Sequence, residues 1–93
     1  MLTAPFLAAV QIVVEPVFWT TDRNLDQVYR LASDGAVLDT FALPRSEPRG
    51  ITLADTGSGL RLLVACYDGG TQRILEIDPA TGTVLDEWIA PAQ

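Results

Sequence analysis

The chain of 93 residues contains no histidine and no lysine, and it has a single cysteine. The absence of histidine removes the commonest metal ligand and general base of enzyme active sites. Six basic residues stand against twelve acidic ones, which gives a net charge of −6, and no block or stripe of basic residues exists. Binding to nucleic acid requires such a stripe to neutralise phosphates. The composition therefore argues against histidine-dependent enzymes and against nucleic-acid binding proteins.

The lone cysteine, Cys66, ends the apolar run Leu62–Cys66. It has no partner for a disulfide within the chain, and a nucleophilic role requires an activating base that the sequence does not supply. We therefore expect a small buried hydrophobic residue, with an interchain disulfide as the minor alternative. The cellular compartment is not predicted by this feature.

The N-terminal stretch, residues 2–14, is apolar except for Thr3 and Gln11. It lacks the basic region of a signal peptide, and its length is too short to span a bilayer. We expect it to belong to the core of the fold. A membrane-associated domain through residues 2–14 is the less favoured alternative, and no membrane partner is predicted.

One segment occurs twice: Gly35–Pro44 recurs 47 positions later as Gly82–Pro91, with glycine, valine, leucine, aspartate and proline at the same places. Such a repeat indicates one supersecondary unit used twice. The glycine that opens each segment supplies the positive φ of a tight turn, so each copy predicts a β-hairpin.

The repeat extends upstream into further strands. Val28–Leu31 aligns with Ile74–Ile77, and Val17–Thr20 aligns with Leu62–Ala65. In the second copy, Gly50–Ala54 predicts one more strand, closed by a glycine-containing turn. Residues 5–14 correspond to it in the first copy, but no glycine pair marks the turn there.

Four strands per copy with a period of about 46 residues are typical of a β-propeller blade. The predicted fold class is all-β, with two four-stranded antiparallel blades at residues 1–46 and 47–93. The apolar runs at 17–20 and 62–66 predict strands covered on both faces, and Asp39 and Asp86 predict an outer strand partly in water. Another antiparallel fold such as a sandwich, or a mixed fold with a helix at 5–14, remains as an alternative.

The second copy resembles known propeller repeats. Pro48-Arg-Gly-Ile51 and the segment Ile74-Leu-Glu-Ile-Asp-Pro79, which continues through Thr81-Gly82 to Val84, are similar to NHL, YncE-like and gluconolactonase-like repeats. The resemblance covers residues 17–91 and implies the fold more than a function. Gluconolactonase-like enzymes hold a metal with acidic and amide residues from several blades, and nothing in this sequence matches such a ligand set.

Two blades are too few to close a propeller, which carries four to eight. The bare blade faces would expose more apolar surface than soluble monomers tolerate. We therefore expect cyclic self-association, as a homotrimer with six blades in preference to a homotetramer with eight. The alternative is that the two blades belong to a larger propeller.

Ligands of propellers usually meet the face formed by the loops around the axis, here residues 22–27, 45–49 and 67–73. A ring of Asp22 or Asp68 side chains from several copies would suit Ca²⁺, and a ring of Arg49 would suit a carboxylate or phosphate. The competing interpretation is that these are solvated turn residues. The candidate ligand-binding residues are Asp22, Arg23, Asn24, Asp26, Arg45, Arg49, Tyr67, Asp68 and Arg73.

The sequence thus predicts a non-enzymatic propeller module that acts by self-assembly and by binding a ligand or protein through its loop face. The alternative is a piece of a larger propeller enzyme or sensor, lactonase-like or glutaminyl-cyclase-like, with its catalytic residues elsewhere. No residue of this chain is predicted to be catalytic.

Overall fold

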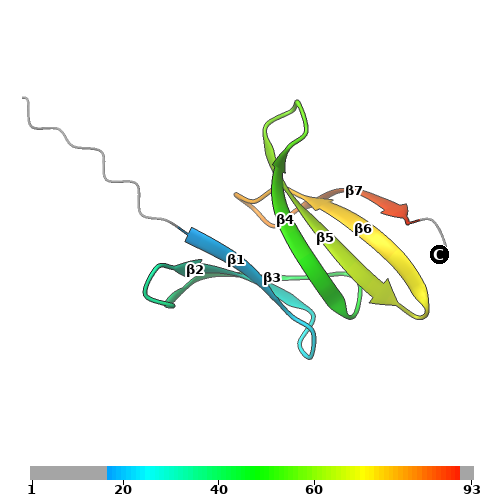
Figure 1. The fold of residues 1–93 in the computed structure, drawn as a ribbon, viewed down its shortest axis with the longest axis horizontal. Helices are drawn as coiled ribbons and strands as arrows, with labels where there is room; N and C mark the ends of the chain where they lie inside the picture. The colour runs from blue at the N-terminus through cyan, green and yellow to red at the C-terminus, as the bar shows by residue number, and fades with distance from the viewer. Residues whose placement is uncertain (1–16, 91–93) are drawn as a thin grey trace, which may run out of the picture.

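The structure is a computed structural model, and it describes residues 17–90. These residues form seven β-strands in two antiparallel sheets, with no helix (Figure 1). The expectation of an all-β fold is confirmed. The predicted strand or helix at residues 5–14 lies outside the described residues. Within 17–90, there is no helix with the length and hydropathy needed to cross a membrane.

Sheet 1 contains three strands in the order β1-β2-β3, and sheet 2 contains four in the order β4-β5-β6-β7. In both sheets neighbouring strands follow one another along the chain, as in an antiparallel meander. The strands of sheet 1 are β1 (Val17–Asp22), β2 (Gln27–Ala32) and β3 (Val37–Ala42). The strands of sheet 2 are β4 (Pro48–Asp55), β5 (Leu60–Asp68), β6 (Thr71–Ile77) and β7 (Val84–Ile89).

The two sheets repeat each other down to an irregularity in strand pairing. The register of β2 with β3 shifts between Arg30 and Leu31, and that of β6 with β7 shifts between Glu76 and Ile77. These are matching positions of the two copies, 46 residues apart. The three strands of sheet 1 therefore correspond to the last three strands of sheet 2. The sequence positions that correspond to β4 fall before Val17, outside the described residues.

The pairing corrects the sequence alignment of β1 by one residue. Phe18 lies opposite Leu31, and Leu62 lies opposite Ile77, so Phe18 corresponds to Leu62. The alignment of Val17 with Leu62 was wrong, because it ignored that a shift of one residue turns every side chain to the other face of a strand. Neither apolar run carried a mark that fixed its register.

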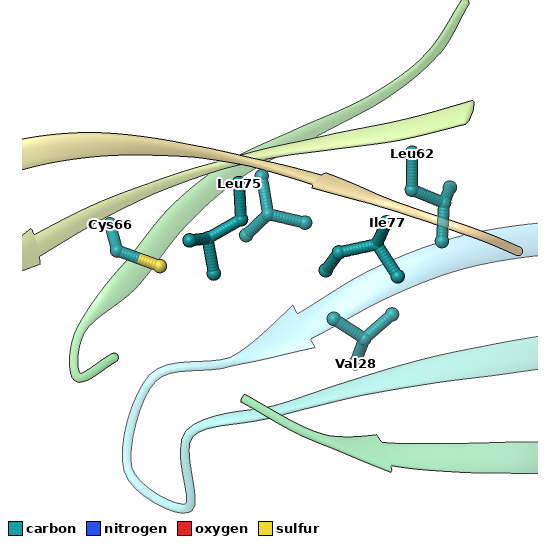
Figure 2. Close-up of a cluster of buried hydrophobic side chains, with 6 residues drawn as sticks. Val28, Leu62, Cys66, Leu75 and Ile77 are labelled. Atoms are coloured by element: carbon teal, nitrogen blue, oxygen red, sulfur yellow. The ribbon is translucent and has the colours of Figure 1, made fainter. Parts of the chain in front are cut away.

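The hydrophobic core lies between the two sheets. Val28 of β2 faces side chains of β5 and β6, among them Leu62, Leu75 and Ile77, and all four are at most 1% exposed (Figure 2). Trp19 and Phe41 of sheet 1 pack against this cluster at its margin. We call the two sheet faces that meet here the inner faces, and the two that point away the outer faces.

The expectation that the runs at 17–20 and 62–66 are covered on both faces is wrong for the single chain. Along β5, buried and half-buried residues alternate, with Leu62, Val64 and Cys66 on the buried side. In β1, Val17 and Phe18 are 39% and 56% exposed. Residues 17–90 therefore supply cover for the inner faces alone.

The two glycines that open the repeated segments confirm the turn prediction. Gly35 and Gly82 have φ angles of +89° and +78°, in the left-handed region that glycine adopts without steric cost. Gly82 also touches sheet 1, because a β-carbon added there would lie 2.6 Å from the ring of Phe41. The turn between β6 and β7 is thus part of the contact between the sheets.

Candidate functional site

The segment that joins the sheets is held against the turns at one end of the molecule. The amide of Glu47 donates to the side chain of Asp26 at 3.0 Å, and the amide of Leu43 donates to the carbonyl of Asp26 at 2.9 Å. The carbonyl of Glu47 in turn accepts from the amide of Tyr67 at 3.0 Å. Asp26 and Glu47 have φ angles of +55° and +51°, which are strained for residues other than glycine. These hydrogen bonds hold the linker, residues 43–47, against the β1–β2 turn on one side and the β5–β6 hairpin on the other.

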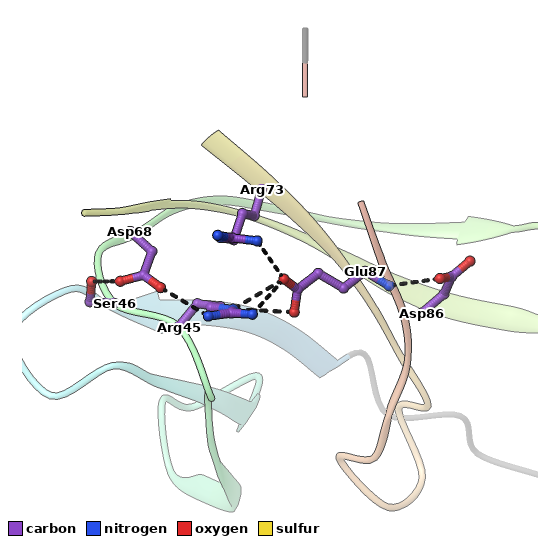
Figure 3. Close-up of polar contacts among 6 residues, drawn as sticks. All are labelled: Arg45, Ser46, Asp68, Arg73, Asp86 and Glu87. Carbon is purple, nitrogen blue, oxygen red and sulfur yellow. Dashed lines mark hydrogen bonds and ion pairs between the residues drawn. The ribbon is translucent and has the colours of Figure 1, made fainter. Parts of the chain in front are cut away.

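An arginine cluster, which we define as Arg45, Ser46, Asp68, Arg73 and Glu87, ties the same linker to sheet 2 (Figure 3). Arg45 pairs with Glu87 at 2.8 Å and with Asp68 at 3.4 Å. Arg73 donates to Glu87 at 2.9 Å, and the hydroxyl of Ser46 donates to Asp68 at 2.7 Å. Two guanidinium groups and two carboxylates balance one another, so the cluster is neutral overall.

These contacts change the acidity of both carboxyl groups. Hydrogen bonds from Arg45 lower the pKa of Glu87 below its ordinary value of 4.5. The hydroxyl of Ser46, assisted by the charge of Arg45, lowers the pKa of Asp68 below 3.8. In each case the ionised form is the one that is hydrogen-bonded. Both groups are therefore charged at neutral pH, and the arrangement suits a fixed ion-pair network rather than proton transfer.

Arg49 lies beside this cluster and is more open to water. Its guanidinium lies over the ring of Tyr67, 4.7 Å from the ring centre, and pairs with Glu47 at 3.1 Å. The Arg49 side chain is 53% exposed. Arg49, Tyr67 and Arg73 take part in lining a small cavity of about 150 Å³ on sheet 2. This cavity combines apolar walls with a cation at its margin.

Asp22 organises the turn between β1 and β2. Its carboxylate accepts hydrogen bonds from the amides of Asn24 at 2.9 Å and Leu25 at 3.1 Å, and from the hydroxyl of Tyr29 at 3.0 Å. The amide bonds, that of Leu25 foremost, lower the pKa of Asp22 below 3.8. Arg23 and Asn24 project from this turn into solvent. The Asp22 carboxylate therefore stabilises the β1–β2 turn by accepting hydrogen bonds from its amides.

The structure brings six of the nine predicted site residues to one end of the molecule, in contact with the linker or with the arginine cluster. They are Asp26, Arg45, Arg49, Tyr67, Asp68 and Arg73. The other three, Asp22, Arg23 and Asn24, lie on the β1–β2 turn without a direct link to the cluster. Among residues 17–90, no three acidic or cysteine side chains gather closely enough to hold a metal ion.

Sequence reasoning missed Glu87 and Ser46. Glu87 belongs to β7, the last strand of sheet 2, and was not among the candidate residues. Its counterpart in sheet 1 is Thr40, since Thr40 pairs with Tyr29 as Glu87 pairs with Leu75. The added acid in the second copy of the repeat was the available signal for a partner to Arg45.

Comparisons with known proteins give no relative for this chain. No protein-family model matches it, and neither a curated protein nor a solved structure does so. The functional conclusion therefore depends on the geometry of the chain itself.

Proposed function

We propose that this chain is a non-enzymatic β-propeller module, which assembles with copies of itself into a closed ring and binds a ligand or protein through its loop face. The loop face is the end of the molecule that carries the β1–β2 turn, the β5–β6 turn and the linker. Two blades stack within one chain, and further copies supply the others.

The observation that carries this proposal is the repeated sheet, with its matching register shift, stacked face to face on its counterpart. Strands that meander from one edge of a sheet to the other, in sheets that stack through apolar faces, are the elements of a propeller. The resemblance of residues 17–91 to NHL-like repeats favours the same architecture. Three copies would give six blades, and four would give eight.

The loop face suits binding better than catalysis. The carboxylates of Asp68 and Glu87 pair with Arg45 and Arg73. Arg49, which pairs with the exposed Glu47, is the half-exposed cation beside the cavity. A ring would present Arg49 once per copy, and guanidinium groups bind carboxylates and phosphates through paired hydrogen bonds. An anionic ligand is therefore the chemistry we assign to this face. Calcium held by Asp22 side chains of several copies stays a prediction.

The second candidate is that these two blades form part of a larger propeller enzyme or sensor. The same exposed apolar faces favour it, since blades of a longer chain would cover them equally well. In that case the arginine cluster would fix neighbouring blades, and the catalytic residues would lie on other blades.

A tandem fusion separates ring closure from open association. Three copies of the full chain, joined by flexible linkers, should behave as a monomer of about 30 kDa, three times the mass of 10.0 kDa. Two joined copies should still associate, because their terminal faces remain bare. If the threefold fusion continues to associate and a fourfold fusion does not, the ring has eight blades. A single chain that stays monomeric at all concentrations would contradict self-assembly.

A further inference from the structure

Each sheet has an outer face that nothing within residues 17–90 covers, and both faces expose large apolar side chains among polar ones. On sheet 1, Phe18 and Val37 are 56% and 59% exposed. On sheet 2, the outer face carries Trp88, which is 43% exposed, beside the half-buried Leu63 and Ile74. Faces of this kind mark interaction surfaces in soluble proteins.

The outer face of sheet 1 repeats the inner face of sheet 2. Phe18, Leu31 and Val37 lie in one cross-strand row. The corresponding row of sheet 2 is Leu62, Ile77 and Val84, which forms part of the core. The outer face of sheet 1 thus has the side-chain pattern of a face that is buried elsewhere in the same chain.

The converse holds for the other two faces. On the inner face of sheet 1, the row Thr21, Val28 and Phe41 packs against sheet 2 through its last two members. The matching row of sheet 2 is Ala65, Ile74 and Trp88, on its outer face. Both halves of the contact between the sheets are therefore present a second time, one on each outer face.

We propose that the outer face of sheet 1 docks on the outer face of sheet 2 of a second copy of this chain, and repeats the contact between the two sheets. This inference rests on the proposed function, and it names the surfaces that would build the ring. The two faces differ from each other, so the contact is head-to-tail and can continue from copy to copy.

A second copy fits these faces better than an unrelated protein, because the chain already contains a working example of the interface. Val28 and Phe41 pack on the row of Leu62 within the chain, and Ile74 and Trp88 would pack on the row of Phe18 between chains. In these rows the match extends to side-chain size, since Phe18 corresponds to Leu62. In the same way Val28 corresponds to Ile74, and Phe41 corresponds to Trp88.

The contact between copies would be more polar than the one within the chain. Thr20 and Tyr29 stand on the outer face of sheet 1 where the inner face of sheet 2 has Val64 and Leu75. The hydroxyl of Tyr29 is already hydrogen-bonded to Asp22 at 3.0 Å and to Gln27 at 2.9 Å. Its ring can therefore be buried without leaving a polar group unpaired.

Two substitutions test the pairing of faces. Phe18→Asp places a charge on the outer face of sheet 1, and Trp88→Asp places one on the outer face of sheet 2. Each variant alone should be a monomer of 10.0 kDa. An equimolar mixture should form a 1:1 heterodimer and nothing larger, because each variant keeps the face that the other lacks. Light scattering after gel filtration measures all three samples.

Controls keep the test decisive. Leu25→Asp changes a residue that is 63% exposed in the β1–β2 turn, away from both faces, and should retain the mass of the unaltered chain. Circular dichroism reports whether each variant is folded, and Val37→Asp replaces Phe18→Asp if that variant unfolds. If either blocked variant alone forms dimers, or if their mixture stays monomeric, the head-to-tail contact is wrong. If the unaltered chain and both variants all oligomerise, this interface is wrong, but the proposed function is not contradicted. If the unaltered chain is a monomer, the proposed function is contradicted as well.

Discussion

Sheet 1 and sheet 2 share one arrangement of strands, yet sheet 2 buries more of its side chains than sheet 1 does. Sheet 2 contributes Leu62, Val64, Cys66, Leu75 and Ile77 to the core, whereas sheet 1 contributes Val28. The difference arises because the inner face of sheet 1 mixes apolar residues with the ion pair of Arg30 and Asp39. The apolar side chains of Phe18 and Leu31 lie on its outer face instead. Within residues 17–90, sheet 1 therefore has a neighbouring sheet on its inner face and none on its outer face.

The first test compares two corresponding positions. Leu62→Ala removes a fully buried side chain and should lower the free energy of unfolding by about 2–5 kcal/mol. Phe18→Ala, at the matching place in sheet 1, should change it by less than about 0.5 kcal/mol in a monomer. Urea unfolding measures both in the Trp88→Asp background, which we expect to be monomeric. Equal losses would mean that the outer face of sheet 1 is already covered within one chain.

The two turn glycines provide a second matched pair. Gly82→Ala places a β-carbon 2.6 Å from the ring of Phe41 at a positive φ. It should lower the free energy of unfolding by about 2–4 kcal/mol. Gly35→Ala has the same kind of φ and open space around it, so about 1–2 kcal/mol is expected. The difference in thermal stability isolates the contact of the β6–β7 turn with sheet 1. If Gly35→Ala were the more damaging change, that contact would not hold the sheets together.

A smaller effect concerns pH and is confined to sheet 2. The folded-state pKa values of Glu87 and Asp68 lie below 4.5 and 3.8, so these groups stabilise the folded chain above those values. That stabilisation is lost as the pH falls through the lowered folded pKa values. The melting temperature should therefore fall as the pH is lowered from 5 toward 3.

The Arg45→Met variant should show a shallower decline over this range, because the carboxylates lose their partner. Arg23→Met serves as the control, since Arg23 makes no ion pair among residues 17–90 and projects from the β1–β2 turn. An unchanged pH profile in Arg45→Met would show that the cluster contributes nothing to holding the linker.

The last prediction concerns the reactivity of the Cys66 thiol, which reports on the burial of the core and requires no change in stability. Burial raises the pKa of the Cys66 thiol to about 11, assisted by the charge of Asp26. The corresponding residue of sheet 1 is the half-buried Asp22, since Asp22 pairs with Gln27 as Cys66 pairs with Arg73. At pH 8 the folded chain should react with a thiol reagent on the order of 100-fold more slowly than the unfolded chain, because the thiolate is the reactive form. Comparable rates would place Cys66 outside the core.

Much of the fold was predictable from the sequence, and the reasons are local. Gly35 and Gly82 marked the turns, and the repeated hairpins followed from them. The register of β1 was not predictable, because Val17–Thr20 is apolar or β-branched throughout and no residue marks which side faces inward. The site was predictable as a loop cluster, since turns carry Asp26 and Asp68. The ion pairs within it were not predictable. Arg45 and Glu87 are 42 positions apart, and the stacking of the two sheets brings them together.

The central claim is that two stacked sheets are too few and that copies of the chain complete the ring. The most direct test is the mass of the unaltered full chain in solution, measured by light scattering over a dilution series. A closed ring of three copies predicts a plateau at about 30 kDa, three times 10.0 kDa, which falls only on strong dilution. A mass of 10.0 kDa at every concentration would contradict the account.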